Sequence, residues 1–253
     1  MRKLIVLIAA LVCLAVPLKA QDTAKSAETK PAESLPTIDQ ILEKYERTLG
    51  KRATAEKFKT IYMKGSLQVT SASLSGTIEI FSKSPNKQAT VTDLPNYGTV
   101  RNVFNGSEGW MEFPSEGVME ATGIQLAEMR RNADLMREYR LREFYPKMKL
   151  LGKEKSGDRD SYIVEATPAE GNVEKLYFDT QTGLLVRDDG ETESPEGRVS
   201  SERYFEDYKE VDGILYPMTL RQDTTSYDLV IKISEVKHDV PIEDSKFEKP
   251  AAK

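Results

Sequence analysis

Apolar and polar residues alternate along much of this chain after its first sixty residues. In the segments 61–69, 74–80 and 227–236, apolar side chains occupy most alternate positions, and the positions between them are mainly polar. A period of two is typical of a β-strand that buries one face and exposes the other. These segments therefore predict strands with one solvent-exposed side.

Shorter runs of the same kind predict a large antiparallel sheet. Further strands are predicted at 87–93, 98–105, 109–113, 148–154, 162–167, 173–179, 184–187, 203–210 and 215–220. Turn residues such as Asn105-Gly106 and Asp212-Gly213 separate several of them and are typical of hairpins. The acidic segment 187–200 is predicted to be a long exposed loop. About a dozen hairpin-connected strands form a sheet large enough to curl strongly.

Helical spacing occurs before the first strand. Thr37 and Gln40 have the spacing of a capping box, and they begin a segment whose apolar residues share one helical face up to Leu49. Gly50 follows in the usual position for a helix end. A second short helix is predicted at 53–59.

Helical spacing returns once within the run of strands, at 123–145. Leu126, Met129, Ala133 and Met136 recur on one side of this segment, and Pro146 ends it. Two interpretations stay open, a covering helix that fills the core and a movable lid over a cavity. In both, helices cover the concave side of the sheet. The pattern predicts a mainly β (α+β) fold, either an open antiparallel half-barrel or a closed barrel with one helical insert.

The first twenty residues match an export signal. Arg2 and Lys3 precede an apolar run, and Pro17-Leu18-Lys19-Ala20 follows it, so 1–20 is predicted to be a cleaved signal peptide. A membrane anchor needs a longer apolar run, and lipidation of Cys13 needs a small residue before it. We predict that 21–36 is a flexible tether and 37–253 a single domain.

Charge and cysteine content narrow the functional classes. The formal net charge of −5 becomes −8 once Arg2, Lys3 and Lys19 leave with the signal, and no basic stripe remains, so nucleic acid is not expected as a partner. The predicted mature chain contains no cysteine, which excludes disulfides and thiol chemistry.

Standard catalytic and metal-binding patterns are missing from the sequence. His238 is the single histidine, and we interpret it as a surface residue at a strand end. The residues around Ser107 lack the spacing of a nucleophile elbow. Paired acids occur in turn-rich segments, where solvated turns explain them better than catalysis. We expect no cofactor, no metal site and no enzymatic activity.

Methionine and aromatic residues are concentrated around the 123–145 segment. Methionine adapts to irregular apolar partners, so this concentration favours a cavity for acyl chains, although core packing explains any one of these residues equally well. The residues predicted to form the cavity and lid are Ile78, Ile80, Trp110, Met111, Leu126, Met129, Met136 and Tyr139.

Three hairpin segments carry a family resemblance. They are 104–110 (FNGSEGW), 176–187 (LYFDTQTGLLVR) and 208–217 (YKEVDGILYP). From about 37 to 247 the chain resembles the outer-membrane lipoprotein-sorting carrier superfamily, the LolA/LolB-like proteins. The resemblance implies an unclosed antiparallel barrel capped by helices, with an apolar cavity that receives lipid or acyl chains in the periplasm. No cavity arginine of those carriers can be matched to a position in this sequence.

Two functional hypotheses follow from the sequence. The first is a periplasmic carrier or chaperone that holds a lipid or an acylated protein, acts as a monomer and contacts membranes only transiently. The second is a non-catalytic envelope interaction or accessory module, with its cavity filled by its own side chains and with envelope proteins as partners. A hydrolase that uses carboxylates is a third, weaker hypothesis.

Overall fold

The computed structural model describes residues 35–194 and 197–251. The chain from Leu35 onward forms one compact unit. The predicted signal peptide and all but the last two residues of the predicted tether lie outside the described residues. None of the helices in the described part is long and apolar enough to cross a membrane.

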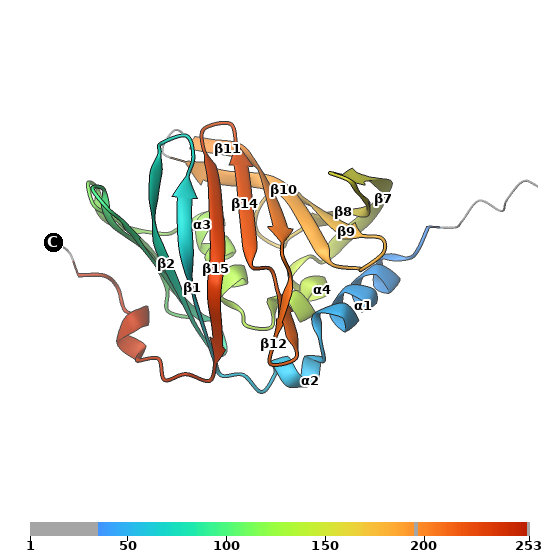
Figure 1. Cartoon of the computed structure of the whole chain (residues 1–253), viewed down its shortest axis with the longest axis horizontal. Helices are drawn as coiled ribbons and strands as arrows, with labels where there is room; N and C mark the ends of the chain where they lie inside the picture. Colours follow the sequence, from blue (N-terminus) through green and yellow to red (C-terminus); the bar gives the residue numbers. More distant parts are fainter. Residues whose placement is uncertain (1–34, 195–196, 252–253) are drawn as a thin grey trace, which may run out of the picture. The chain divides into compact units, whose positions relative to one another are not determined.

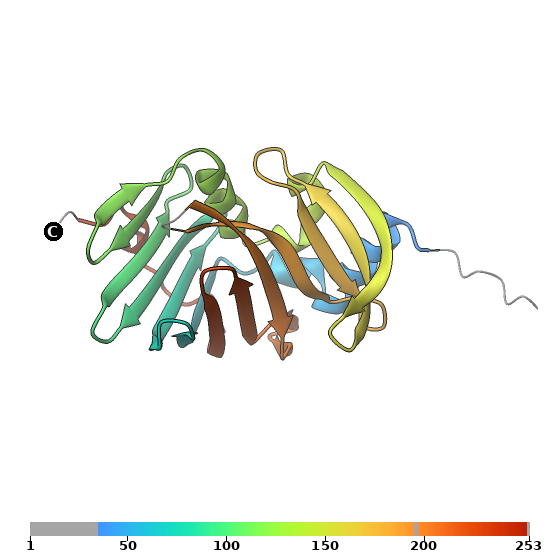
Figure 2. The ribbon, with the colours of Figure 1, turned by 90° about the horizontal axis from the view of Figure 1, so that it is seen from above.

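One open antiparallel sheet of thirteen strands dominates the fold. Its strands, in sheet order, are β6 (Gly117–Glu120), β5 (Gly109–Phe113), β4 (Gly98–Phe104), β3 (Lys87–Leu94), β2 (Leu74–Lys83), β1 (Thr60–Val69), β15 (Asp228–His238), β14 (Thr219–Thr224), β11 (Gly197–Glu206), β10 (Leu185–Ser194), β9 (Glu174–Asp179), β8 (Arg159–Thr167) and β7 (Lys147–Ser156). The first and last strands, β6 and β7, are not paired with each other. The sheet curves without closing, as Figure 2 shows. β12 (Lys209–Val211) and β13 (Ile214–Tyr216) form a separate small hairpin.

Helices cover the concave side of this sheet. They are α1 (Ile38–Leu49), α2 (Arg52–Ala55), α3 (Gly123–Ala133) and α4 (Leu141–Phe144), with a short 3₁₀ turn η1 (Arg137–Tyr139) between the last two. Viewed with β15 in front, α3 and α4 lie behind the sheet (Figure 1). The prediction of an open, helix-covered half-barrel is confirmed. The alternative of a closed barrel is wrong, because the edge strands stay apart.

The sequence explains the start and the end of α1. The Thr37 hydroxyl accepts a hydrogen bond from the Gln40 backbone N–H, and the Gln40 side chain accepts one from the Thr37 N–H, so the predicted capping box is present. Gly50 ends the helix at φ 133°, and a Cβ there would lie 2.2 Å from the Gly213 carbonyl oxygen. Glycine is therefore needed both for the turn and for the contact with the β12–β13 hairpin.

Removing the cap should destabilise the protein modestly. We expect Thr37→Ala to lower the free energy of unfolding by about 1 kcal/mol, because the Gln40 N–H loses its partner at the helix start. Urea denaturation measures the change. Thr37→Asn keeps a capping oxygen and should restore most of the loss. An equal loss in both variants would show that the cap is not the cause.

The two faces of the sheet bury different clusters. On the concave side, Phe178 lies opposite Leu185 and packs with Tyr45 of α1. On the convex side, Phe81 and Trp110 pack around Phe247. Phe247 belongs to a second 3₁₀ turn, η2 (Asp244–Phe247), which follows the last strand. The chain after β15 therefore seals part of the convex face.

The 123–145 segment is not the single long helix that its spacing predicted. α3 ends at Ala133, and the next residue, Asp134, is extended, with φ −71° and ψ 117°. The Asp134 carboxylate accepts a hydrogen bond from the Met136 N–H at 2.7 Å and forms an ion pair with Arg140 at 2.5 Å. An aspartate that binds nearby backbone competes with helix hydrogen bonding, which explains the break.

The prediction of a long loop at 187–200 is also wrong. Residues 187–194 of β10 and 197–200 of β11 belong to paired strands, with Asp188 opposite Arg203 and Glu193 opposite Arg198. Acidic residues and serine have low strand propensity, but their neighbours in the sheet override that weak preference. β6 was not predicted, because only four residues form it.

Candidate functional site

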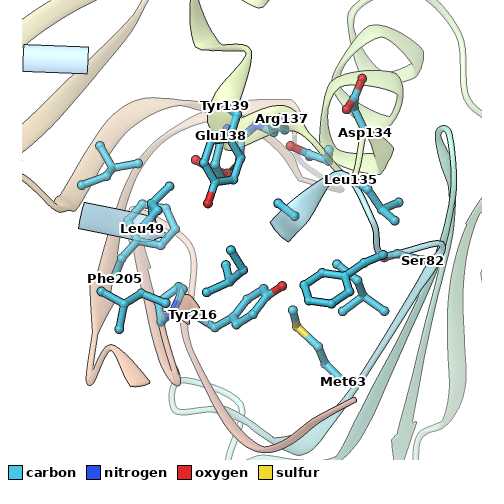
Figure 3. A pocket seen from close by; sticks show the side chains of 18 of the residues that line it. Leu49, Met63, Ser82, Asp134, Leu135, Arg137, Glu138, Tyr139, Phe205 and Tyr216 are labelled. Atoms are coloured by element: carbon cyan, nitrogen blue, oxygen red, sulfur yellow. Dashed lines mark hydrogen bonds and ion pairs between the residues drawn. The ribbon is translucent and has the colours of Figure 1, made fainter. Parts of the chain in front are cut away.

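An apolar cavity of about 230 Å³ lies between the concave face of the sheet and the helices. Figure 3 shows side chains from both layers pointing into it. Its apolar and aromatic lining residues are Tyr45, Leu49, Ala55, Phe58, Ile61, Met63, Ala133, Leu135, Tyr139, Leu185, Phe205, Tyr208, Ile214, Leu215, Tyr216 and Pro217. Ligand sites are commonly clefts of this character with a few polar groups.

The local structure explains why these side chains converge. Ile61 and Met63 are two residues apart on β1 and therefore face the same side of the sheet. Tyr45 and Leu49 are four residues apart on α1 and share its buried face. Tyr216 comes from the β12–β13 hairpin, which closes another side. The cavity therefore depends on packing between elements that are distant in sequence.

One polar chain of contacts lies on the cavity wall. The Tyr45 hydroxyl donates to Glu138 at 2.6 Å, and Glu138 accepts a second hydrogen bond from Nη1 of Arg137 at 3.0 Å. Burial opposes the charge of Arg137, but the adjacent Glu138 carboxylate raises the pKa of Arg137 overall. The guanidinium therefore stays cationic at the edge of an apolar space.

A second cavity, of about 150 Å³, is lined mainly by polar and charged residues. These residues are Glu128, Arg131, Asn132, Arg137, Tyr145, Glu174, Asp188, Gly190, Glu191, Ser201, Arg203 and Gln222. Two of them, Asn132 and Arg137, also line the apolar cavity. The two spaces therefore share a wall.

Paired charges build the floor of the second cavity. Asp188, whose side chain is 3% exposed, accepts two hydrogen bonds from Arg203, at 2.7 and 2.8 Å. Burial raises the pKa of Asp188, and the adjacent Arg203 opposes that shift. Glu174 pairs with Arg131 at 3.1 Å. These ion pairs hold the side chains of Arg203, on β11, and of Arg131, on α3, in fixed positions.

Tyr145 makes the stability of this region sensitive to alkaline pH. Its hydroxyl donates to Glu174 at 2.6 Å. Burial, followed by the effect of Glu174, raises the pKa of Tyr145 to about 12, although Arg137 acts in the opposite direction. Because the pKa of Tyr145 is higher in the folded protein, its protonated hydroxyl contributes to the free energy of unfolding. This contribution is complete below the pKa of about 10 that tyrosine has in the unfolded chain, and it is lost as the pH rises towards 12.

We therefore expect the free energy of unfolding to fall between about pH 10 and pH 12. Denaturation curves at several pH values measure the slope, and ultraviolet absorbance reports phenolate formation. Tyr145→Phe should reduce the slope in this window. An unchanged slope in that variant would assign the alkaline sensitivity to other residues.

His238 is not the surface residue that the sequence suggested. Its side chain is 3% exposed and stacks on Phe58 with ring centroids 3.8 Å apart. Nδ1 lies 2.7 Å from an Asp212 carboxylate oxygen, and Nε2 lies 2.8 Å from the Tyr216 hydroxyl. With Asp212 accepting from Nδ1–H, Tyr216 donates to Nε2. This series of contacts fastens the β12–β13 hairpin to the end of β15.

The eight residues predicted to form the cavity and lid are dispersed. Tyr139 lines the apolar cavity. Met129 lines a separate cavity of about 240 Å³, and Met136 packs on the edge of the core around α1. Trp110 lies on the opposite, convex face and is 5% exposed, so its predicted place in the cavity is corrected. Trp110 is in register with Val103, Ala89 and Phe81 on the neighbouring strands, so all four side chains lie on the same face of the sheet.

The remaining predicted residues lie on or above the concave face. Ile78 is buried with Leu67, and Ile80 packs against the same cluster. Met111 accepts a contact from Gln125 Nε2 at 3.1 Å, and Leu126 is half-buried on α3. None of these residues lines the apolar cavity.

Most of the actual lining residues were not predicted from the sequence. Tyr45 and Leu49 were assigned to helix packing, and Tyr208 and Tyr216 were noted only within a hairpin motif. The aromatic residues on both sides of Asp212-Gly213 were the one feature of the sequence that could have indicated that this hairpin lines the cavity. Within 35–194 and 197–251, no group of three or more histidine, cysteine or acidic residues is placed to hold a metal ion.

Comparisons with known proteins identify the fold. No protein-family model and no curated protein sequence matches this chain. Among solved structures, a DUF1329 family protein from Desulfovibrio piger is 18% identical with a TM-score of 0.59, and 85% of this chain and 98% of that chain are covered. A LolA superfamily protein from Nitrosomonas europaea is 17% identical with a TM-score of 0.57, and 85% of this chain and 99% of that chain are covered.

At these identities the likeness establishes the fold alone. Both matches extend over nearly the whole of the other chain. The chain therefore has the LolA/LolB-like fold that its hairpin sequences suggested.

Proposed function

We propose that this protein is a carrier-type binding protein that holds an apolar ligand, a lipid or the acyl group of a protein, beneath its helices. The observation that carries the proposal is the apolar cavity on the concave face. In a LolA-superfamily fold this is the face on which the family resemblance places a lipid cavity. Burial of each methylene group contributes roughly 0.8 kcal/mol, so even a short chain would bind measurably.

The proposal includes export to the periplasm. Residues 1–20 would serve as the signal peptide, 21–36 as a tether, and 37–253 as a monomeric binding domain. The ligand would be transferred without a chemical step and without a cofactor. Contact with a membrane or an envelope protein would then be transient, during loading or release.

A dye titration tests the proposal. An environment-sensitive apolar dye should bind the mature protein saturably at one site, and decanol should displace it. Saturable binding that decanol does not affect would place the dye elsewhere. No saturable binding of dye or decanol would contradict the proposed function.

A second function is favoured by the size of the cavity. Its volume of about 230 Å³ is below the range of about 300–1,000 Å³ that is usual for ligand pockets. The small cavity means that the protein's own side chains fill most of the space under the helices, as expected for a non-catalytic envelope interaction module. Failure of dye and decanol binding would favour this function.

A further inference from the structure

The apolar and the charged cavity together suggest a more specific ligand. Arg137 and Asn132 line both cavities. A ligand that extends past these two residues would meet aromatic and aliphatic side chains at one end and guanidinium groups at the other. This is the arrangement that an amphiphile requires.

Most charged groups around the second cavity already have partners. Arg203 is held by Asp188, and Arg131 is held by Glu174 and by the Glu170 carbonyl oxygen at 2.8 Å. These contacts fix the guanidinium groups in place before any ligand arrives. Such preorganisation reduces the cost of binding.

Arg137 differs from the other two arginines. Its Nη1 donates to Glu138, and within the described residues its buried Nε has no hydrogen-bond partner. A guanidinium carries five N–H donors. Arg137 lines both cavities, so a ligand acceptor can reach the donors that its guanidinium presents at the shared wall, and a charge-assisted hydrogen bond there would add affinity.

We propose that the two cavities form one binding site for a single-chain amphiphile with a monoanionic head. Its tail occupies the apolar cavity, and its head, a carboxylate or a singly charged phosphate ester, lies against Arg137 at the shared wall. This inference rests on the proposed function and specifies its ligand class. Asn132 supplies a second polar group beside the head.

The geometry limits both the tail and the charge. An apolar volume of about 230 Å³ fits one short chain better than the several chains of a triacylated lipoprotein. Glu128 and Glu191 also line the second cavity, and both already interact with other groups. Their negative charges disfavour a dianionic head. Glu174 and Asp188 line the same cavity but are paired with Arg131 and Arg203, so a head with a single negative charge meets less repulsion than a dianion.

Calorimetric titration of the mature protein with matched probes tests the inference. We expect decanoate to bind about tenfold or more tightly than decanol, because a charge-assisted hydrogen bond adds to the same tail burial. Decyl phosphate, which is largely dianionic at neutral pH, should bind less tightly than decanoate. Acetate and inorganic phosphate should bind much more weakly, because they lack the tail.

Variants at the shared wall separate the head from the tail. Arg137→Gln should reduce decanoate affinity to near that of decanol and should reduce decanol affinity by much less, because decanol carries no charge. Arg130→Gln, which removes an exposed arginine from α3, is the matched control and should change neither. If Arg137→Gln does not fold, Asn132→Asp supplies the test, because it places a negative charge at an exposed position of the same wall.

The outcomes distinguish this inference from the proposed function. Equal affinities for decanol and decanoate would overturn the monoanionic head and leave the apolar carrier intact. A decanoate preference that survives both Arg137→Gln and Asn132→Asp would place the head elsewhere and also overturn the inference. If neither probe binds, the proposed function fails first. Tight binding of inorganic phosphate alone would indicate a free-anion site instead.

Discussion

Replacing Met63 with tryptophan is expected to abolish most uptake of apolar ligand while the protein stays folded. Met63 lies on the concave side of β1, and its side chain points into the cavity (Figure 3). The larger ring would occupy volume that the ligand needs. Excluding about two methylene groups already costs roughly 1.6 kcal/mol, so we expect affinity for decanol to fall at least about tenfold.

The control for this variant adds the same ring on the other face. Lys64 is the next residue on β1 and is exposed, so Lys64→Trp should leave decanol binding unchanged. Met63→Trp should change the free energy of unfolding by less than about 1 kcal/mol, because the ring fills an existing space instead of displacing packed atoms. Decanol affinity close to wild type in Met63→Trp would show that the ligand binds outside this cavity.

Removing the partner of a buried carboxylate should have the largest effect on stability. Arg203→Met leaves Asp188, 3% exposed in the native protein, without its two charge-assisted hydrogen bonds. Breaking one side of a buried ion pair typically costs about 3–5 kcal/mol. We expect a loss of this size in the free energy of unfolding at neutral pH, measured by urea denaturation.

The pH dependence of this loss has a definite sign. Burial raises the pKa of Asp188, and without Arg203 that shift is opposed only by the smaller effect of Arg137. A carboxyl whose folded pKa lies above its unfolded value stabilises the fold at low pH, and the contribution disappears as pH rises through the folded pKa. The deficit of Arg203→Met should therefore shrink in mild acid.

A double variant tests whether the unpaired charge is the cause. Asp188→Leu together with Arg203→Met removes both charges and should recover most of the lost stability, because apolar replacement of a buried pair is often close to neutral. If the double variant is as unstable as Arg203→Met alone, packing of the Arg203 side chain explains the loss and the charge does not.

Regular elements could be predicted where local chemistry and pattern agree. The Thr37–Gln40 capping box and the alternation of β15 are both present as expected. The break at Asp134 could not be predicted from the spacing of apolar residues, because the Asp134 side chain binds the Met136 N–H and Arg140 and competes with helix hydrogen bonding. The β10–β11 hairpin was missed because its acidic residues have cross-strand partners, such as Arg203 opposite Asp188.

The site was harder to predict than the fold. Alternation shows which residues share a face, but it does not show which face is concave. Trp110 was therefore assigned to the cavity, although the chain around Phe247 covers its face. Tyr139 lines the apolar cavity, and it belongs to the segment between α3 and α4 that covers the sheet.

His238 illustrates the same difficulty for polar residues. Its position after the last strand suggested exposure, and no sequence pattern shows that Phe58 stacks on it. Its contacts with Asp212 and Tyr216 form only after the β12–β13 hairpin has folded against β15. Long-range contacts of this kind decide both the burial of polar groups and the shape of the cavity.

Native mass spectrometry of protein purified without detergent from the cells that produce it tests the central claim most directly. We expect wild-type protein to carry a single-chain lipid or acylated molecule at one to one, and Met63→Trp protein isolated in parallel to carry little or none. If the wild type is free of ligand and remains so after lipids are added, the cavity does not bind lipid and the carrier proposal is contradicted.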